Sequence, residues 1–435
     1  MMSAAQSPTT LESKLKALQC HFTWDLDHRK SILLRHRDYL EDIGTEEGNS
    51  WLGHIYNLRG FVQYQLGFTE DAQSLFNKAA EAFRKIRNAD QGPWLVVNYG
   101  DLAWLHHHLG DQAESQAYLS KVHALMKKYP SPSQDPQDQL HPEIYAEKAW
   151  TLMKFSTDKK PAADYFQRAI RMQPDMVEWN TSYVLGLVSN FWQNYKGPEA
   201  ELLEKMRLAK EQDPENLYLA VHYLEQCAKK RQKIKEEARE LARKVLRNPV
   251  SSYSGIRPLL RLFINHVSID EAIALAEEAL GTHPEERYLK SCLAYCYKWK
   301  IFKESPKQSE IDRAISLNEE VIDLYPHSSF AKKMNLAKLY LKLDDCRDKA
   351  EQMYQELLRR DREPADKQML YYNYANYLHF YRKDSEASLR YHMEVAKIPL
   401  QSIFRKKSIT TLKKNQNTSP IGREIEEFLA ILPEP

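Results

Sequence analysis

The sequence predicts an all-α fold made of repeated helix-turn-helix pairs, and three observations support this prediction. One spacing of small and bulky residues recurs along the chain. Only 13 of the 435 residues are glycine, so the turn signals of an all-β fold are scarce. Apolar residues make up 43% and charged residues 28% of the chain, a composition that suits stacked helices. A solenoid of this length needs no division into globular domains, because each repeat packs only on its neighbours.

The recurring pattern is a small residue, a bulky residue four positions later, a small or β-branched residue three positions after that, and often a proline five positions further on. Complete matches lie at Ala162, Phe166, Ala169 and Pro174 and at Ala272, Ala276, Ala279 and Pro284. Weaker or partial matches lie at Ala72, Phe76 and Ala79; at Met206, Ala209 and Pro214; at Ala238, Ala242 and Val245; at Ala314, Asn318, Val321 and Pro326; and at Ala350, Tyr354 and Leu357.

This spacing has a physical reason. Positions i, i+4 and i+7 share one face of a helix, so small residues there allow the paired helix to approach closely. Proline then ends the helix. The pattern is typical of the second helix of a tetratricopeptide repeat, and we predict about eight or nine irregular pairs in a right-handed superhelix with a central groove or tunnel. Gly60 takes the small position of a first helix, while Gly67 and Gly110 are predicted to end helices.

Two irregular stretches interrupt the repeats. The segment 129–142 contains four prolines and is interpreted as a linker. The spacing from Ala272 to Ala314 exceeds the ideal 34 residues, and we place the excess between two helices, in 298–310. We therefore predict three blocks of repeats, 1–130, 140–280 and 285–435, with residues 1–10 disordered. The last block contains the basic segment 405–414 and a short acidic tail.

Composition excludes or disfavours several classes of protein. The first twenty residues lack the apolar core of a secretory signal, and no run of eighteen apolar residues could form a transmembrane helix. The cysteines are Cys20, Cys227, Cys292, Cys296 and Cys346; their odd number and sparse spacing indicate reduced thiols in the cytosol. A net charge of +2 does not exclude an anionic partner, because a solenoid can carry a basic inner surface beneath an acidic outer one.

Catalytic and cofactor-binding motifs are absent: there is no P-loop, no GxGxxG after a strand, no GxSxG and no HExxH. We predict a binding protein without enzymatic activity, cofactor or bound metal. Three successive histidines, His106–His108, cannot share one ion well, because adjacent helical side chains point in different directions. Cys292 and Cys296 lie one helical turn apart, but no second Cys/His pair accompanies them, so buried core cysteines are the favoured interpretation.

The segment LQCHFTWDL, residues 18–26, resembles the opening signature of the interferon-induced proteins with tetratricopeptide repeats. The likeness continues in order through almost the whole chain, at 95–110, 141–155, 268–280, 293–300, 373–388 and 404–414. The resemblance implies a cytosolic, interferon-responsive antiviral protein. Well-studied members hold the 5′ end of single-stranded RNA in a positively charged tunnel, select a triphosphate or an incompletely methylated cap, and block translation of foreign RNA. Other members act through hetero-oligomers or signalling adaptors.

The resemblance also implies eight RNA-contacting positions, which are Arg35, Trp150, Lys154, Leu185, Arg257, Phe330, Lys413 and Lys414. Trp150 falls where the family stacks an indole on the cap guanine, and Lys154 matches a lysine that contacts the 5′ phosphates. Their spacing of four residues puts the ring and the ammonium on one helical face, as a cap with attached phosphates requires. Trp150 as a core residue, and Lys154 as a surface charge, are the structural alternatives.

The other positions carry further implied roles. Arg35 matches a phosphate-contacting position, and Arg257 matches an arginine that faces the RNA. Leu185 borders the cap pocket in this comparison, Phe330 lies near the first nucleotides, and Lys413–Lys414 match a basic stretch that tracks the RNA backbone. Arg257 could equally be a surface charge.

Four positions depart from the family pattern. Tyr39 replaces a glutamine, Ser189 replaces a phosphate-contacting arginine, and Ser291 and Cys292 replace a His-Gln pair that reads the first bases. The loss of the arginine matters because charge-assisted pairs are the strong ones in a phosphate pocket. The preferred RNA end, and the retention of RNA binding, therefore stay open.

Two functions from different classes follow. The first is an RNA-binding effector whose partner is single-stranded viral RNA, with homo- or hetero-oligomers of related repeat proteins and no membrane partner. The second is a protein–protein scaffold in antiviral signalling; an enzyme is a distant third. Aromatic residues are abundant, notably in 369–381, and most should fill helix interfaces. The RNA-binding function is favoured if one cavity collects the basic residues Arg35, Lys154, Arg257 and 405–414. The scaffold function is favoured if the cavity is acidic or filled with aromatic side chains.

Overall fold

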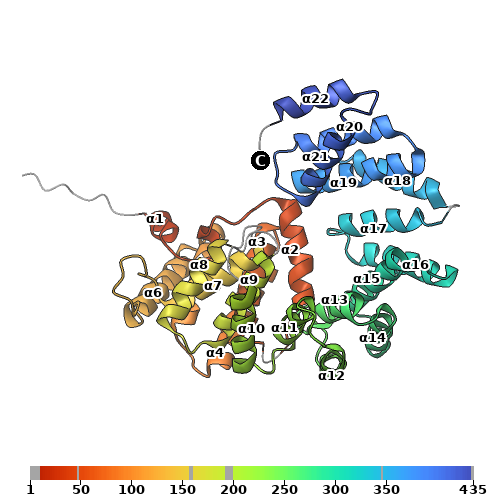
Figure 1. Ribbon diagram of the computed structural model, residues 1–435. Helices are drawn as coiled ribbons and strands as arrows, with labels where there is room; N and C mark the ends of the chain where they lie inside the picture. The colour runs from red at the N-terminus through yellow and green to blue at the C-terminus, as the bar shows by residue number, and fades with distance from the viewer. Residues whose placement is uncertain (1–9, 47–48, 156–159, 192–198, 344–345, 433–435) are drawn as a thin grey trace, which may run out of the picture. The chain divides into compact units, whose positions relative to one another are not determined.

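The computed structural model describes residues 10–46, 49–155, 160–191, 199–343 and 346–432, without the side chains of 189–191 and 199. Regular structure in these ranges is helical throughout, as predicted (Figure 1). The chain splits into two compact units, Met1–Cys292 and Leu293–Pro435, and each is described by itself. The finer division into three repeat blocks stays a prediction. Among the described residues, no helix combines the length and the apolar character needed to cross a bilayer.

The first unit contains α1 Leu11–Lys16, η1 His21–Thr23, α2 Lys30–Ile43, α3 Leu52–Gln65, α4 Thr69–Arg87, η2 Pro93–Leu95, α5 Val96–His108, α6 Gln112–Lys128, α7 Pro142–Phe155, α8 Lys160–Met172, α9 Val177–Phe191, α10 Glu199–Gln212, α11 Leu217–Lys229, α12 Lys235–Val245, α13 Ile256–His266 and α14 Ile269–Thr282. Helix α15, Arg287–Lys303, begins in the first unit and ends in the second. The second unit continues with α16 Gln308–Leu324, α17 Phe330–Tyr340, α18 Arg347–Leu358, α19 Pro364–Tyr377, the π-helix η4 Leu378–Arg382, α20 Ser385–Lys397, α21 Ile403–Asn415 and α22 Gly422–Ile431.

Consecutive helices pack as antiparallel pairs, which is the architecture that the repeat pattern predicts. The pairs α3/α4, α5/α6, α7/α8, α9/α10, α11/α12, α13/α14, α17/α18 and α19/α20 all pack against each other. The patterned residues lie in second helices and are buried: Ala72, Phe76 and Ala79 in α4, Ala162, Phe166 and Ala169 in α8, and Ala272, Ala276 and Ala279 in α14. Their burial confirms that the spacing marks the face turned toward the neighbouring helices.

Three glycines act as the pattern predicts. A Cβ added to Gly60 would lie 2.8 Å from Cε1 of Phe76, so a larger residue in α3 would collide with the bulky position of α4. Gly67 and Gly110 follow α3 and α5 with φ of +91° and +81°, in the left-handed region that favours glycine. Gly60 therefore allows a close contact between α3 and α4, and Gly67 and Gly110 form the turns that end α3 and α5.

The two irregular stretches differ from the prediction in their local structure. The segment 129–142 is non-helical until Pro142, as a proline-rich linker should be, but it is anchored to the repeats. Asp138 is buried and pairs with Arg171, while Nη1 of Arg168 donates to the carbonyl of Gln137 at 2.8 Å. The excess residues after 297 lengthen α15 and α16 to 17 residues each and do not form a long loop.

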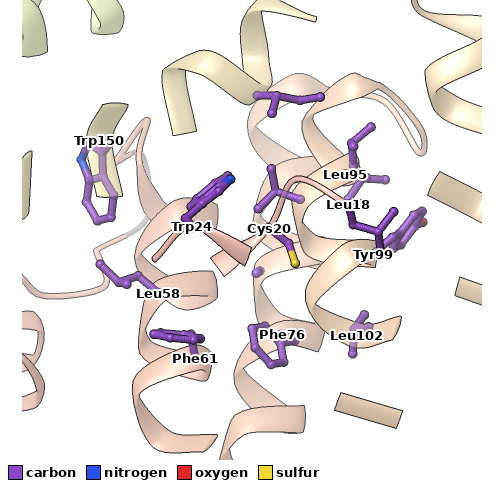
Figure 2. Close-up of a cluster of buried hydrophobic side chains, with 14 of the residues drawn as sticks. Leu18, Cys20, Trp24, Leu58, Phe61, Phe76, Leu95, Tyr99, Leu102 and Trp150 are labelled. Atoms are coloured by element: carbon purple, nitrogen blue, oxygen red, sulfur yellow. The ribbon is translucent and has the colours of Figure 1, made fainter. Parts of the chain in front are cut away.

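The signature segment 18–26 is a structural element of the first unit. The main-chain N–H of His21 donates to Oδ1 of Asp101 at 2.9 Å, and Nδ1 of His21 lies 2.7 Å from Oδ2 of the same carboxylate. The other ring nitrogen, Nε2, lies 3.1 Å from Oγ1 of Thr151. All three residues are buried, so this network fastens the segment to α5 and α7. Figure 2 shows Leu18, Cys20 and Trp24 among the core side chains.

Burial of an ionisable group in this unit predicts a pH dependence. Burial raises the pKa of Glu143 from 4.5 to about 7, although Nη2 of Arg87 lies 3.0 Å from its Oε1. The neutral carboxyl is therefore favoured in the folded state, and its contribution to stability is complete below pH 4.5 and lost as pH rises through 7. Glu143→Gln removes this titration. As the pH rises from 5 to 8, the free energy of unfolding of the variant should therefore increase relative to that of the wild type by up to about 3 kcal/mol.

Urea unfolding at the two pH values checks this expectation, with the exposed Glu285→Gln as the matched control. An equal response of wild type and Glu143→Gln to pH would contradict it.

Candidate nucleic-acid interface

The site is built around the last turn of α7, where Lys154 lies. Its ammonium group sits 4.4 Å from the ring centroid of Tyr253 and 5.6 Å from that of Trp150. Tyr253 belongs to the turn between α12 and α13, so the contact joins two repeats that are distant in sequence. A cation over an aromatic ring is an arrangement that can bind a phosphate next to a stacked base.

Trp150 and Lys154 share one face of α7, as the spacing predicts, but their exposure differs. The Trp150 side chain is fully buried, with its ring stacked on Trp51 at 5.7 Å and 16° between planes. Lys154 is half-buried. In this structure the indole therefore packs in the core (Figure 2), and its stacking on a cap would require the ring or its neighbours to move. The role of Trp150 in cap binding stays a prediction.

Helix α2 brings the predicted phosphate-contacting arginine to the same region. His36 stacks on Phe155, the last residue of α7, at 4.1 Å and 15°. Arg35 precedes His36 and is half-buried, and Tyr39 lies one turn further along α2 with 40% of its surface exposed. The chain therefore carries a partly exposed tyrosine at the position where the family pattern has a glutamine.

Hydrogen bonds and ion pairs join the C-terminal end of α2 to the start of α15, which is the last helix of the first unit in sequence. Arg287, the first residue of α15, donates from Nε to Oδ1 of Asp42 at 3.0 Å and from Nη2 to the carbonyl of Asp38 at 2.9 Å. Its Nη2 also lies 3.0 Å from Oε2 of Glu41. The main-chain N–H of Ser252 donates to the Asp42 carbonyl at 2.7 Å. These contacts hold α2 beside the turn that carries Tyr253.

The arginines of α13 bind partners within the first unit. Nη1 of Arg257 donates to Oγ of Ser291 at 3.3 Å. Arg261 binds Glu225 through two hydrogen bonds of 2.9 and 2.7 Å. Such a bidentate pair neutralises most of the positive charge of Arg261.

The remaining predicted residues have varied surroundings. Leu185, in α9, packs against the apolar cluster of α9, α10 and α11, and the side chain of Ser189 lies outside the described residues. Cys292 and Cys296 are fully buried, as predicted for core cysteines, and burial raises the pKa of the Cys292 thiol. Ser291 and Cys292 are neighbours in α15, and the Ser291 hydroxyl lies 3.3 Å from Nη1 of Arg257.

Phe330, Lys413 and Lys414 belong to the second unit. Phe330 begins α17, and the guanidinium carbon of Arg362 lies 4.4 Å from its ring centroid. Lys413 and Lys414 are exposed on the last turn of α21. Arg405, at the start of the basic segment, is buried and donates from Nε to the Ala396 carbonyl at 3.0 Å. Arg405 is therefore a structural residue, and the lysines supply the exposed charge.

Sequence reasoning missed the aromatic part of the site. Tyr253 lies in an irregular turn, where no helical periodicity marks its direction. Its ring packs edge-on against Tyr218 at 5.7 Å. Asp42 and Arg287 are also missed, because their pairing joins positions that lie at opposite ends of the first unit in sequence. The spacing of residues within one repeat does not predict contacts between distant repeats.

Comparison with known proteins supports the fold and the family resemblance. A tetratricopeptide-repeat family model matches residues 51–128, which span α3 to α6. The chain is 27% identical to the "Antiviral innate immune response effector IFIT1" of Macaca fascicularis, covering 93% of this chain and 87% of that protein. It is 25% identical to human "Interferon-induced protein with tetratricopeptide repeats 2", covering 93% and 87%. These matches confirm the resemblance found from the sequence motifs.

Solved structures match the whole course of the chain. A monomeric mutant of IFIT1 solved with Gppp-AAAA has a TM-score of 0.73 at 23% identity, covering 97% of this chain and 98% of that one. The human IFIT1 dimer with PPP-AAAA has a TM-score of 0.72 at 24% identity, covering 95% and 92%. At these identities the matches establish a common fold, a tetratricopeptide-repeat superhelix.

Proposed function

We propose that this chain, a relative of the interferon-induced proteins with tetratricopeptide repeats, binds the 5′ end of single-stranded RNA in the cytosol and thereby restricts translation of viral RNA. Relatives with this fold are named antiviral effectors, and two of the solved relatives hold RNA with a triphosphate or a guanosine cap. Binding of this kind needs phosphate contacts and stacking, and it needs no catalytic group.

The observation that carries the proposal is the grouping of Lys154, Tyr253 and Arg257 beside α2. Lys154 lies over the Tyr253 ring at 4.4 Å, and Nη1 of Arg257 donates to Oγ of Ser291 at 3.3 Å. Helix α2 contributes Arg35 and the exposed Tyr39 to the same region. Cations interleaved with aromatic rings suit a phosphate group attached to a stacked base. Leu185, Phe330, Lys413 and Lys414 are proposed contacts on the strength of the resemblance alone.

The alternative, a protein–protein scaffold, also has a specific observation in its favour. Arg261 and Arg287 are held by Glu225 and Asp42, so part of the positive charge of the first unit is neutralised internally. A surface of balanced charge with exposed aromatic residues suits a peptide as well as a nucleic acid. The two functions differ in their dependence on the phosphates of the ligand.

The experiment compares one short RNA carrying triphosphate, cap, monophosphate or hydroxyl 5′ ends, labelled at its 3′ end and titrated with the purified full chain. Fluorescence anisotropy should give the tightest binding for a phosphorylated end. Raising salt from about 50 to about 200 mM should weaken binding about tenfold, as release of counterions from a few phosphates requires. An affinity that depends on neither the 5′ end group nor the salt concentration would overturn the RNA proposal and favour the scaffold.

A further inference from the structure

The link between α15 and α16 carries an exposed serine that the fold does not use. Residues 304–307 join the two helices (Figure 1), and Ser305 is exposed within this link. Within the part of the chain that the structure describes, neither the main chain nor the hydroxyl of Ser305 takes part in a hydrogen bond. A second protein could therefore bind this side chain without breaking any contact of the fold.

The backbone that follows Ser305 is extended. Pro306 comes next, and a proline disfavours the helical conformation of the residue before it. Lys307 has φ of −74° and ψ of 155°, and its main-chain N–H donates to Oε2 of Glu310 at 2.7 Å. This hydrogen bond fixes the start of α16 at Gln308. The link is therefore non-helical from one helix to the next, and the Ser305 hydroxyl can enter the cleft of an enzyme that binds an extended segment.

Serine followed by proline occurs four times in the chain, at Ser7, Ser131, Ser305 and Ser419. Ser7 lies outside the described residues. The hydroxyl of Ser131 is half-buried and donates to the Asp138 carbonyl at 2.5 Å. Oγ of Ser419 accepts the main-chain N–H of Ile421 at 3.3 Å within a turn. Among the three described Ser-Pro pairs, only Ser305 is exposed and has a hydroxyl that makes no contact within the fold.

The charges around Ser305 suit a phosphate group. Lys303 and Lys307 lie two residues before and two residues after it, and both are exposed. The adjacent carboxylate of Glu304 pairs with Lys300, so its negative charge is largely neutralised. A phosphoserine carries a charge of about −1.5 to −2 at pH 7. At this position it would lie between two lysines and just before the first turn of α16, where negative charge is favourable.

We propose that Ser305 is a phosphorylation site for a proline-directed serine/threonine kinase, with ATP as the phosphoryl donor. Oγ of Ser305 attacks the γ-phosphorus of ATP and forms the new O–P bond. The bond between the γ-phosphorus and the bridging oxygen breaks, and ADP leaves. The hydroxyl proton passes to the catalytic aspartate of the kinase. Because the reaction requires the acceptor hydroxyl to lie in line with the bond that breaks, exposure of Ser305 on a non-helical link is the observation that carries the proposal.

The test incubates the purified full chain with ATP and a proline-directed serine/threonine kinase and locates the phosphate by tandem mass spectrometry. The wild type should gain a phosphate at Ser305, and Ser305→Ala should gain none in this link. Pro306→Ala keeps the acceptor hydroxyl but should lower the initial rate about tenfold or more, because an apolar group missing from a specificity pocket costs about that much. Ser131→Ala and Ser419→Ala are the matched controls and should be modified at Ser305 at the rate of the wild type.

Two further measurements make each outcome decisive. An unrelated Ser-Pro peptide shows that the kinase is active, and thermal unfolding of Ser305→Ala, expected to match that of the wild type, shows that the variant is folded. An active kinase that leaves the wild-type chain unmodified overturns the proposal, as does a phosphate found only at Ser7, Ser131 or Ser419. Equal rates for the wild type and Pro306→Ala overturn the assignment to a proline-directed kinase.

Discussion

Replacing Asp101 with alanine is expected to lower the free energy of unfolding by about 3–5 kcal/mol, because two buried hydrogen-bonding groups of His21 would lose their partner. The Asp101 carboxylate accepts the main-chain N–H of His21 at 2.9 Å and lies 2.7 Å from Nδ1 of its ring. Both residues are fully buried, so neither donor could turn to water. The segment 18–26 should then loosen from α5 and α7.

Urea or thermal unfolding measures this effect, with two variants for comparison. Asp101→Asn keeps one acceptor oxygen of similar shape and should cost less than alanine. Asp164→Ala, on the exposed side of α8, should leave stability nearly unchanged. If Asp101→Ala cost no more than Asp164→Ala, the signature segment would have a role other than the structural one.

The second large effect is expected for Trp150→Ala, which should cost about 3–5 kcal/mol of stability through the cavity it leaves. The Trp150 ring is fully buried and stacks on Trp51 at 5.7 Å. Trp150→Phe keeps a stacked ring and should cost less. Thermal unfolding of the two variants checks the order, and a fully stable alanine variant would contradict the packing seen here.

Trp150→Phe also makes the cap prediction testable without loss of the fold. Selective weakening of capped RNA in this variant, with triphosphate RNA unaffected, would show that the indole reaches the cap. Equal binding of both RNAs would leave Trp150 with a packing role only.

The helix pairs could be predicted from the sequence because their signal is local. Ala162, Phe166 and Ala169 fall within two turns of one helix, and the face they form must be buried whatever surrounds it. The anchoring of 129–142 could not be predicted in this way. Its composition indicates a linker, and the burial of Asp138 depends on Arg171, which lies in a different helix.

The candidate site was predicted only in part, for the same reason. The spacing of Trp150 and Lys154 places both on one face of α7, but the burial of one and the partial exposure of the other depend on Trp51 and Tyr253. Tyr253 is brought to Lys154 by the packing of distant repeats. Contacts between such repeats leave no periodic mark in the sequence.

The most direct test of the RNA-binding account is the affinity of Lys154→Ala for triphosphate-ended RNA, compared with that of Lys148→Ala. The two lysines lie on the same helix, and Lys148 also sits over an aromatic ring, 4.9 Å from that of Tyr165. Loss of a hydrogen bond to a charged group should weaken binding by Lys154→Ala about tenfold to hundredfold. Lys148→Ala should bind as the wild type does. Equal affinities of Lys154→Ala and the wild type at low salt would contradict the central claim.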